Sequence, residues 1–323
     1  MIRSFVFNQT QGKLISQDIS LDLLKVVLQD EGVQFWVDVG ECTDEEAKEV
    51  LDGVFHFHPL AIEDCLTPSD RSKVEEYEDH VFMVIHAVTY HEGEFKTAEL
   101  DLFIGRNFLV TFHRERLRCV NATVDRVIKN APTVARAPDR LTYTLLDFLL
   151  EGYAPALEDL SLEIAELEKN VLVDPSQSIL KNVLQIKTEV QRLRQIVWPQ
   201  RETMARMSHG EFKIVRSHML PYYRDLLDQL VKISTMAENA RDSLTNVLQV
   251  HLNLQQMQVN HVIKALSVMA TLFMPVLVVT SYYGMNVTHW PGPEDNYAWT
   301  WIWAITAAMT AMLYLVMKRK GWW

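Results

Sequence analysis

The sequence predicts an α+β domain followed by a long stalk helix and two transmembrane helices. Three observations support this fold class. Strand-like alternation is confined to residues 1–138, no Gly or Pro lies between Pro221 and Pro275, and two charge-free apolar runs lie near the C-terminus. Short alternating segments are typical of a sheet, whereas an apolar helix of about 20 residues is long enough to cross a bilayer.

The first domain, residues 1–138, is expected to contain a sheet with short helices. Its strand-like segments are Phe35–Val39, His80–Tyr90 and Leu100–Phe112, the last broken by a turn at Gly105-Arg106-Asn107. Thr43, followed three residues later by Glu46, has the pattern of a capping box and predicts the start of a helix. These signals together indicate a mixed α and β arrangement.

Residues 139–220 carry no strand signal and predict an antiparallel helical pair. One helix is expected from Arg140 to Val173 and a second from Ser176 to about Arg206, with Asp174-Pro175 between them. A turn at Ser208-His209-Gly210 closes the pair, and Pro199 is expected to kink the second helix.

Residues 221–261 predict a stalk helix that continues into the membrane. Apolar and small residues recur there at alternating spacings of three and four, which is typical of a heptad seam that packs on partner helices. The seam consists of Leu230, Ile233, Ala237, Ala240, Leu244, Val247, His251 and Leu254.

The first membrane helix is expected over residues 262–286 and the second within 297–323, joined by an outer loop at 287–296. The charge-free run Ala265–Tyr283 would span roughly 28 Å as a helix. The loop carries Glu294 and Asp295 and no Lys or Arg, whereas Lys318, Arg319 and Lys320 follow the second run. The positive-inside rule therefore predicts two passes with both termini in the cytoplasm.

Composition excludes several classes of function. A formal net charge of -11 argues against a nucleic-acid partner. No nucleotide-binding loop, nucleophile elbow or zinc-protease motif is present, so we expect neither an enzyme nor an organic cofactor. The three cysteines, Cys42, Cys65 and Cys119, show no metal-type spacing and are expected to be reduced.

Several motifs, taken in order, resemble the CorA family of divalent-cation channels, and the resemblance covers essentially the whole chain. The matching segments are His58–Asp64, Lys73–Glu75, Val197–Pro199, Pro221–Asp225, Phe273–Pro275, Tyr283-Gly284-Met285-Asn286 and the basic-aromatic tail. The resemblance implies a funnel-shaped homopentamer in the plasma membrane (the inner membrane of a bacterium). It also implies passive Mg²⁺ influx, with Co²⁺ and Ni²⁺ as further cargo.

The resemblance assigns the selectivity filter and the pore lining. Gly284, Met285 and Asn286 would form the filter at the outer mouth, where amide oxygens can hold Mg²⁺ through its water shell. The carried-over pore-lining positions are Asn260, Ile263, Leu266, Ala270, Met274, Leu277 and Ser281. Their apolar members would form rings that close the pore by dewetting.

The resemblance also implies regulation by intracellular Mg²⁺ bound between protomers. Asp225 matches the family's aspartate in the stalk, and the partner position falls on the loop that carries His91, Glu92 and Glu94. Glu294 and Asp295 would attract cations to the outer mouth. Lys318, Arg319 and Lys320 would form a basic ring at the cytoplasmic end.

Other readings stay open at the level of sequence. A zinc transporter of the related ZntB branch, coupled to protons, is the first alternative, and His289 would then be a candidate ligand for Zn²⁺. A membrane-tethered regulatory or scaffold protein is the second. His56 and His58 could form a zinc site, although a packed junction between loop and helix is the simpler interpretation.

Overall fold

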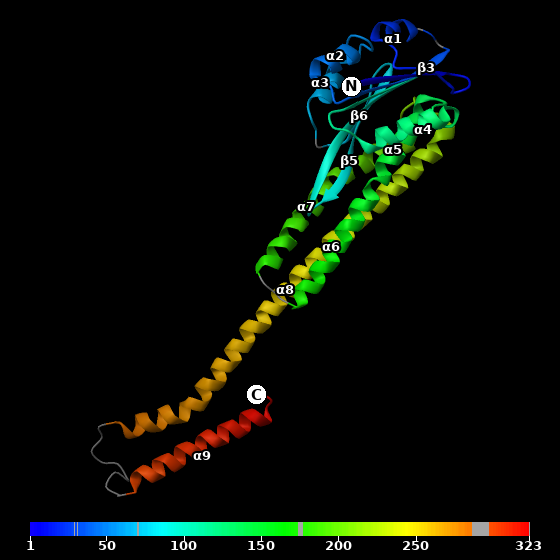
Figure 1. The fold of residues 1–323 in the computed structure, drawn as a ribbon. Helices are drawn as coiled ribbons and strands as arrows, with labels where there is room; N and C mark the ends of the chain where they lie inside the picture. The colour runs from blue at the N-terminus through cyan, green and yellow to red at the C-terminus, as the bar shows by residue number, and fades with distance from the viewer. Residues whose placement is uncertain (29, 31, 70, 174–176, 286–296, 323) are drawn as a thin grey trace. The chain divides into compact units, whose positions relative to one another are not determined.

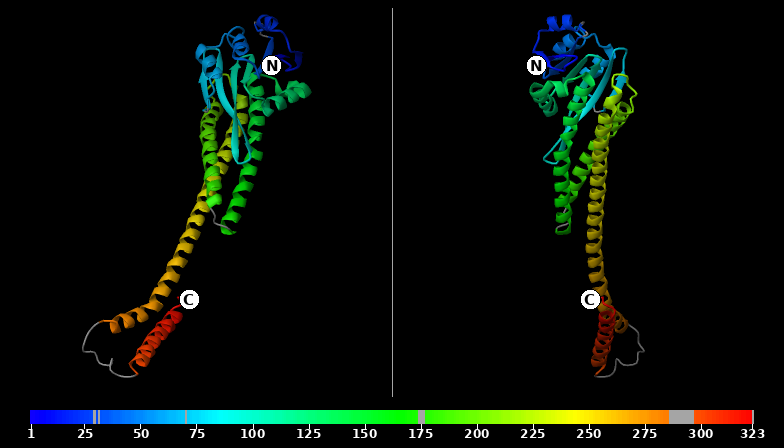
Figure 2. Two further views of the ribbon diagram at one scale, coloured as in Figure 1. Left: turned by 60° about the vertical axis from the view of Figure 1, so that its left-hand side comes forward. Right: turned by 90° about the vertical axis from the view of Figure 1, so that its right-hand side faces the viewer.

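The computed structural model describes residues 1–28, 30, 32–69, 71–173, 177–285 and 297–322. The chain forms two compact units, Met1–Leu248 and Gln249–Trp323. Helix α8 (Leu220–Tyr283) belongs to both, since it continues through the boundary. Figures 1 and 2 trace the chain from the sheet at its N-terminus to the helices at its C-terminus.

The first unit is built on a sheet with the strand order β2-β1-β3-β7-β6-β5-β4 in the described residues. The strands are β1 (Ile2–Asn8), β2 (Leu14–Gln17), β3 (Val33–Gly40), β4 (Lys73–Glu76), β5 (His80–His91), β6 (Glu94–Gly105) and β7 (Phe108–His113). β3 and β7 pair in parallel, and the other neighbours are antiparallel. The predicted strands and the turn after Gly105 are confirmed.

Helices cover both faces of this sheet. On one face, α2 (Asp44–Leu51) and α3 (Pro59–Leu66) pack over apolar residues that alternate along the strands, such as Val84 and Phe103, and α1 (Leu21–Val27) contributes Leu24. The capping box predicted at Thr43 begins α2, because the Thr43 side chain accepts from the Glu46 amide and the Glu46 side chain accepts from the Thr43 amide.

The longer helices lie on the other face: α4 (Arg118–Val134), α5 (Pro138–Glu151), α6 (Tyr153–Val173) and α7 (Gln177–Ser208). The prediction of a single helix from Arg140 to Val173 is wrong, because the chain forms two helices there, α5 and α6, which are divided at Gly152. Glycine disfavours helix interiors, and the next residue, Tyr153, is fully buried with its hydroxyl donating to the His86 carbonyl at 2.7 Å. Pro199 lies inside α7, which continues past it without a break.

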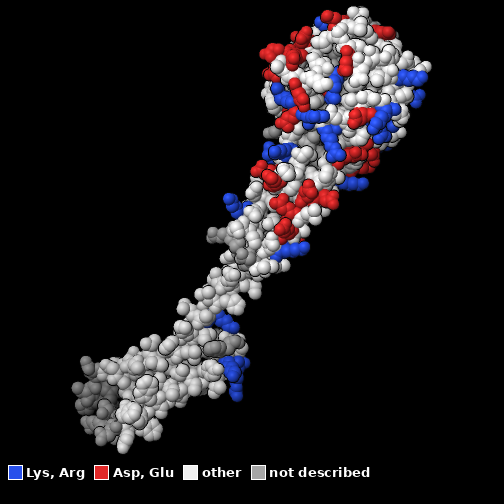
Figure 3. Space-filling model, in the orientation of Figure 1, with Lys and Arg blue, Asp and Glu red and all other residues white. Residues whose placement is uncertain are grey.

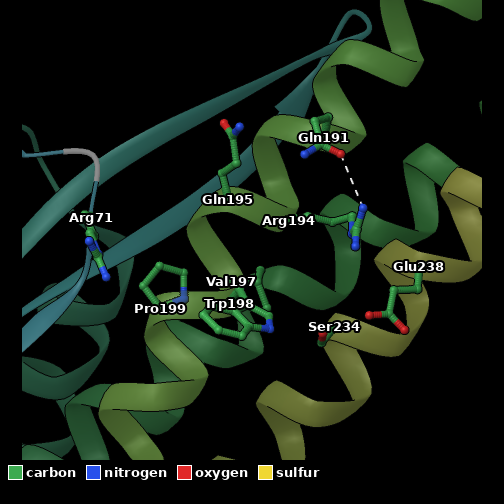
Figure 4. A pocket seen from close by; sticks show the side chains of 9 residues that line it. All are labelled: Arg71, Gln191, Arg194, Gln195, Val197, Trp198, Pro199, Ser234 and Glu238. Carbon is green, nitrogen blue, oxygen red and sulfur yellow. Dashed lines mark hydrogen bonds between the residues drawn. The ribbon is translucent and has the colours of Figure 1, made fainter.

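The heptad seam of α8 is covered within this chain. From Leu230 to Val247 its members are buried, beside α6 and α7. Ser234 and Glu238 of α8 line the same cavity, about 620 Å³, as Trp198 of α7 (Figure 4). The seam is therefore no evidence for additional copies of the chain, because the chain's own helices satisfy it. The short helix η1 (Ser217–Met219) precedes α8.

The second unit contains the end of α8 and α9 (Ala298–Arg319). Both are apolar and long enough to cross a membrane. Among the described residues of this unit the charged side chains are those of Lys and Arg, shown blue in Figure 3. Its large apolar side chains are exposed, including Leu266 at 69% and Trp303 at 70%. A surface of this kind is stable in lipid or against other protein chains, not in water.

Candidate ion pathway and regulatory site

The membrane part of α8 has one covered face. Leu272 and Val276 of α8 line a groove together with Trp303 and Thr310 of α9, so the two helices lie side by side. Val279, two turns beyond Leu272, is 7% exposed. Contact with α9 therefore defines one side of α8 and leaves the opposite side open.

The predicted pore-lining residues share that open side. A helix turns about 100° per residue, which places these positions roughly half a turn away from Leu272 and Val279. All of them are exposed: Asn260, Ile263, Leu266, Ala270, Met274, Leu277 and Ser281. Polar members stand at both ends and apolar members between them. The arrangement brings the predicted positions together on one surface, and their role in conduction stays a prediction.

Gly284 follows the last residue of α8, and its amide donates to the Thr280 carbonyl at 2.8 Å. Its φ is not in the left-handed region, so glycine is not required here by the backbone conformation. The requirement is steric instead. A Cβ at this position would lie 2.9 Å from the Thr280 carbonyl oxygen, closer than real contacts allow. Met285, the next filter residue, is 58% exposed.

The structure describes some of the other predicted positions near the membrane and not others. Asn286, His289, Glu294 and Asp295 lie outside the described residues. Lys318 and Arg319 form the last turn of α9, and Lys320 caps it, so the three positive charges lie at one end of the helix as predicted. Cations at a helix C-terminus also compensate the negative end of its dipole.

Asp225 has a carboxylate neighbour that the sequence did not indicate. The Nε2 amide of Gln229, one turn along α8, donates to Asp225 Oδ2 at 3.2 Å and to Asp147 Oδ1 of α5 at 3.1 Å. Burial, Asp147 and Asp225 together raise the pKa of Tyr143. No spacing rule connects residues so far apart in the sequence, so only the packing of α5 on α8 places Asp147 here.

An aromatic and cationic cluster borders these two carboxylates. The guanidinium of Arg140 lies 4.4 Å from the ring centre of Tyr222 and 5.5 Å from that of Tyr143. The two rings meet edge to face at 5.2 Å. The cluster fixes the beginning of α8 on α5, which holds Asp225 and Asp147 at a defined separation.

The loop expected to complete the regulatory site is the hairpin between β5 and β6. His91 and Glu92 are exposed, with His91 Nε2 3.7 Å from Glu92 Oε1, and Glu94 begins β6. Glu92 and Gly93 have φ values of 51° and 82°, as a tight hairpin turn requires. Within the described residues no group of three His, Cys, Asp or Glu is positioned to hold a metal ion. The single chain thus does not bring this loop and Asp225 into one site.

His58 serves as a helix cap. Its Nδ1 accepts from the Leu60 amide at 3.2 Å at the start of α3, and its ring stacks on Tyr77 at 4.9 Å. Nδ1 is used in this way, and among the described residues no group of three possible ligands is positioned to hold a metal ion, so the interpretation as a packed junction is favoured over a metal site with His56.

Comparison with known proteins agrees with this architecture. The family model described as "CorA-like Mg2+ transporter protein" matches residues 32–319. The cobalt/magnesium transport protein CorA of Thermotoga maritima is 27% identical over 297 residues, covering 91% of this chain and 85% of that protein.

Solved structures show the same fold at lower identity. The complete CorA magnesium transporter of Methanocaldococcus jannaschii superposes with a TM-score of 0.80 at 20% identity, covering 99% of this chain and 98% of that one. The ZntB cytoplasmic domain of Vibrio parahaemolyticus gives a TM-score of 0.60 at 10% identity and covers 78% of this chain and 98% of that one.

Proposed function

This chain belongs to the CorA-like Mg²⁺ transporter family, and from that premise we propose that it is a divalent-cation channel. It would admit Mg²⁺ to the cytoplasm down the electrochemical gradient, with Co²⁺ and Ni²⁺ as further cargo. The carrying observation is the exposed stripe from Asn260 to Ser281, which lies on the side of α8 opposite α9. An apolar stripe with polar ends is suited to a narrow pore that closes by dewetting.

A single helix cannot enclose a pathway, so the channel is an oligomer in which the stripes of several α8 helices face a common axis. We propose a homopentamer in the plasma membrane with both termini in the cytoplasm. Gly284, Met285 and Asn286 form the outer filter, where oxygen groups hold Mg²⁺ through its water shell. Glu294 and Asp295 concentrate cations at the outer mouth, and Lys318, Arg319 and Lys320 surround the cytoplasmic end.

Intracellular Mg²⁺ closes this channel by binding near Asp225, with the hairpin residues His91, Glu92 and Glu94 supplied by a neighbouring protomer. The support is the carboxylate of Asp147, which lies beside Asp225 through their shared contact with Gln229. Two nearby carboxylates, the half-buried Asp147 of α5 and the exposed Asp225 of α8, are a suitable partial ligand set for a hydrated divalent ion.

Divalent-ion flux into liposomes tests the transport proposal. Purified protein is compared for Mg²⁺, Co²⁺, Ni²⁺ and Zn²⁺, with and without a pH gradient, beside the Asn286→Ala variant. We expect Mg²⁺ flux that follows membrane potential, ignores the pH gradient and is lost in the variant. Zn²⁺ flux that requires the pH gradient would instead favour the zinc-transporter branch. An intact oligomer without any flux would favour a regulatory or scaffold protein.

A further inference from the structure

Two acidic residues of the first unit, the half-buried Glu99 and the buried Asp101, are not among the predicted pore and regulatory residues. Glu99 and Asp101 are two residues apart in β6, so their side chains share one face of the sheet. Glu99 lies opposite His86 of β5, and Asp101 lies opposite Phe112 of β7. This is the face on which α3 packs, beside an otherwise apolar core.

Both carboxylates line a cavity of about 220 Å³. Its lining includes Cys65 of α3, Ser69, His86 and Arg114, together with Glu99 and Asp101. Both acids therefore border a partly open cavity and are not sealed into the apolar core.

One oxygen of each carboxylate is buried without a hydrogen-bond partner among the described residues: Glu99 Oε1 and Asp101 Oδ1. Asp101 is only 1% exposed. Glu99 Oε2, in contrast, accepts from the Ser69 amide at 2.8 Å. Burial raises the pKa of Glu99, and burial together with the charge of Glu99 raises the pKa of Asp101 well above its ordinary value. Buried carboxylate oxygens without partners are costly, and a bound cation would offset that cost.

Two other side chains that line the cavity, His86 and Cys65, are poor candidates for ligands. His86 has Nε2 2.6 Å from the Ser69 carbonyl and Nδ1 3.1 Å from the Ser72 hydroxyl, so neither ring nitrogen is free. Burial and the charge of Asp101 raise the pKa of the Cys65 thiol well above its ordinary value, which disfavours the thiolate that a soft metal would need.

The nearest fixed positive charge is also occupied. Arg114 donates to Asp44 at 2.9 Å and to the Leu66 carbonyl at 2.6 Å. Among the side chains considered, Glu99 and Asp101 are the ones that keep a buried oxygen without a hydrogen-bond partner. Oxygen ligands select hard cations, whereas Zn²⁺ prefers thiolate and imidazole.

We propose that Glu99 and Asp101 hold one hydrated Mg²⁺ ion in this cavity, as a binding site separate from the pore and from Asp225. Two carboxylates are enough, because Mg²⁺ retains several of its waters and commonly takes only one or two protein carboxylates. This agrees with the absence of a three-residue ligand group in the described part of the chain. The cavity has room for several waters around the ion. The site does not depend on transport activity.

Alkylation of Cys65 in the full-length protein in nanodiscs tests this site. Cys65 is 1% exposed and lines the cavity, so a reagent reaches it only when this region opens. An ion that binds the closed state slows that opening, and at ten times its Kd the rate falls about elevenfold. Cys119, 4% exposed in α4, is the internal reference for global opening, and each rate is measured by peptide mass spectrometry with MgCl₂ as the only addition.

The rates are compared between wild type, Glu99→Gln, Asp101→Asn and Asp225→Asn. We expect Mg²⁺ to slow the alkylation of Cys65 more than the alkylation of Cys119, both in wild type and in Asp225→Asn. The effect should be lost in whichever of the Glu99 and Asp101 variants folds, and both are isosteric. Three results would each overturn the proposal. They are equal slowing of Cys65 and Cys119 alkylation by Mg²⁺, slowing of Cys65 alkylation that persists in the Glu99 and Asp101 variants, and Cys65 alkylation that does not respond to Mg²⁺. Flux is not part of this readout, so an inactive channel would leave the result interpretable.

Discussion

Asp147 of α5 and Asp225 of α8 accept hydrogen bonds from the same amide group. Gln229 Nε2 lies 3.1 Å from Asp147 Oδ1 and 3.2 Å from Asp225 Oδ2. One neutral donor thus stands between two carboxylates on neighbouring helices. In the proposed regulatory site a divalent cation would replace this donor and neutralise both charges, which would link the beginning of the long helix to the concentration of the ion.

Removing either carboxylate should weaken closure by intracellular Mg²⁺. For Asp147→Asn and for Asp225→Asn we expect the Mg²⁺ concentration that halves the flux to rise about tenfold or more, the scale typical of lost metal-site groups. This half-inhibiting concentration is measured from the flux in liposomes loaded with a graded series of MgCl₂ concentrations. Asp228→Asn, an exposed acid three residues further along α8, is the matched control. An equal shift in that control would show that only general surface charge matters.

A second prediction concerns the apolar constriction. Met274 and Met269 are exposed to nearly the same extent, at 61% and 60%, but only Met274 lies on the predicted pore stripe. Met274→Ser should admit water to the closed pore and increase Mg²⁺ flux at high internal Mg²⁺. Met269→Ser should leave that flux close to wild type. If the two variants behave alike, the stripe does not line the pathway.

A third prediction concerns the anchor before α8. Asp139 is 2% exposed in its side chain and accepts from Arg216 Nη2 at 2.6 Å and Nε at 2.8 Å. Arg216→Leu would leave a buried carboxylate uncompensated, and we expect a loss of about 2 kcal/mol in the free energy of unfolding. This is less than for a fully buried ion pair, because Arg216 is half-exposed. Chemical denaturation followed by tryptophan fluorescence checks this.

The matched control for that prediction is Arg241→Leu, which breaks only the exposed pair with Asp242 at 2.8 Å. Its effect should be below about 1 kcal/mol. A loss as large as that of Arg216→Leu would mean that burial of Asp139 is not the cause.

A fourth prediction concerns acid stability. Burial alone would raise the pKa of Asp38, but its hydrogen bond and charge interaction with His113, together with Thr111 and Arg3, hold that pKa below the ordinary value of 3.8. A carboxyl whose pKa is lower when folded contributes stability above the unfolded value, and this is lost as pH falls through the folded value.

Asp38→Asn should therefore be less stable than wild type at pH 6 and should lose less stability between pH 4 and the acid limit. Thermal unfolding of both proteins over this pH range gives the comparison. Asp125→Asn, an exposed acid on α4, serves as the control and should follow wild type. Parallel pH profiles for Asp38→Asn and wild type would contradict the prediction.

Much of the fold could be predicted from local pattern. The strands around Phe35 and His80, the cap at Thr43 and the two apolar spans were all expected, because side-chain periodicity and capping chemistry act within a few residues. The division at Gly152 was missed, since it depends on Tyr153 reaching the His86 carbonyl across the sheet. Helix α4, from Arg118 to Val134, was also not anticipated.

The candidate sites divide along the same line. The stripe from Asn260 to Ser281 could be expected because one helix carries all of it, and the family resemblance gave its register. The position of Asp147 could not be expected from the sequence, because Asp147 approaches Asp225 only when α5 packs on α8.

The sequence by itself determined the central strands, the start of α2 and the membrane spans, because these follow from periodicity, capping and hydropathy along the chain. Only the tertiary structure decided which surfaces the chain itself covers. It buried the seam from Leu230 to Val247, left the stripe around Met274 open, and enclosed Glu99 with Asp101 in one cavity. The reason is that burial and charge pairing depend on contacts between segments far apart in the sequence, which no local pattern contains.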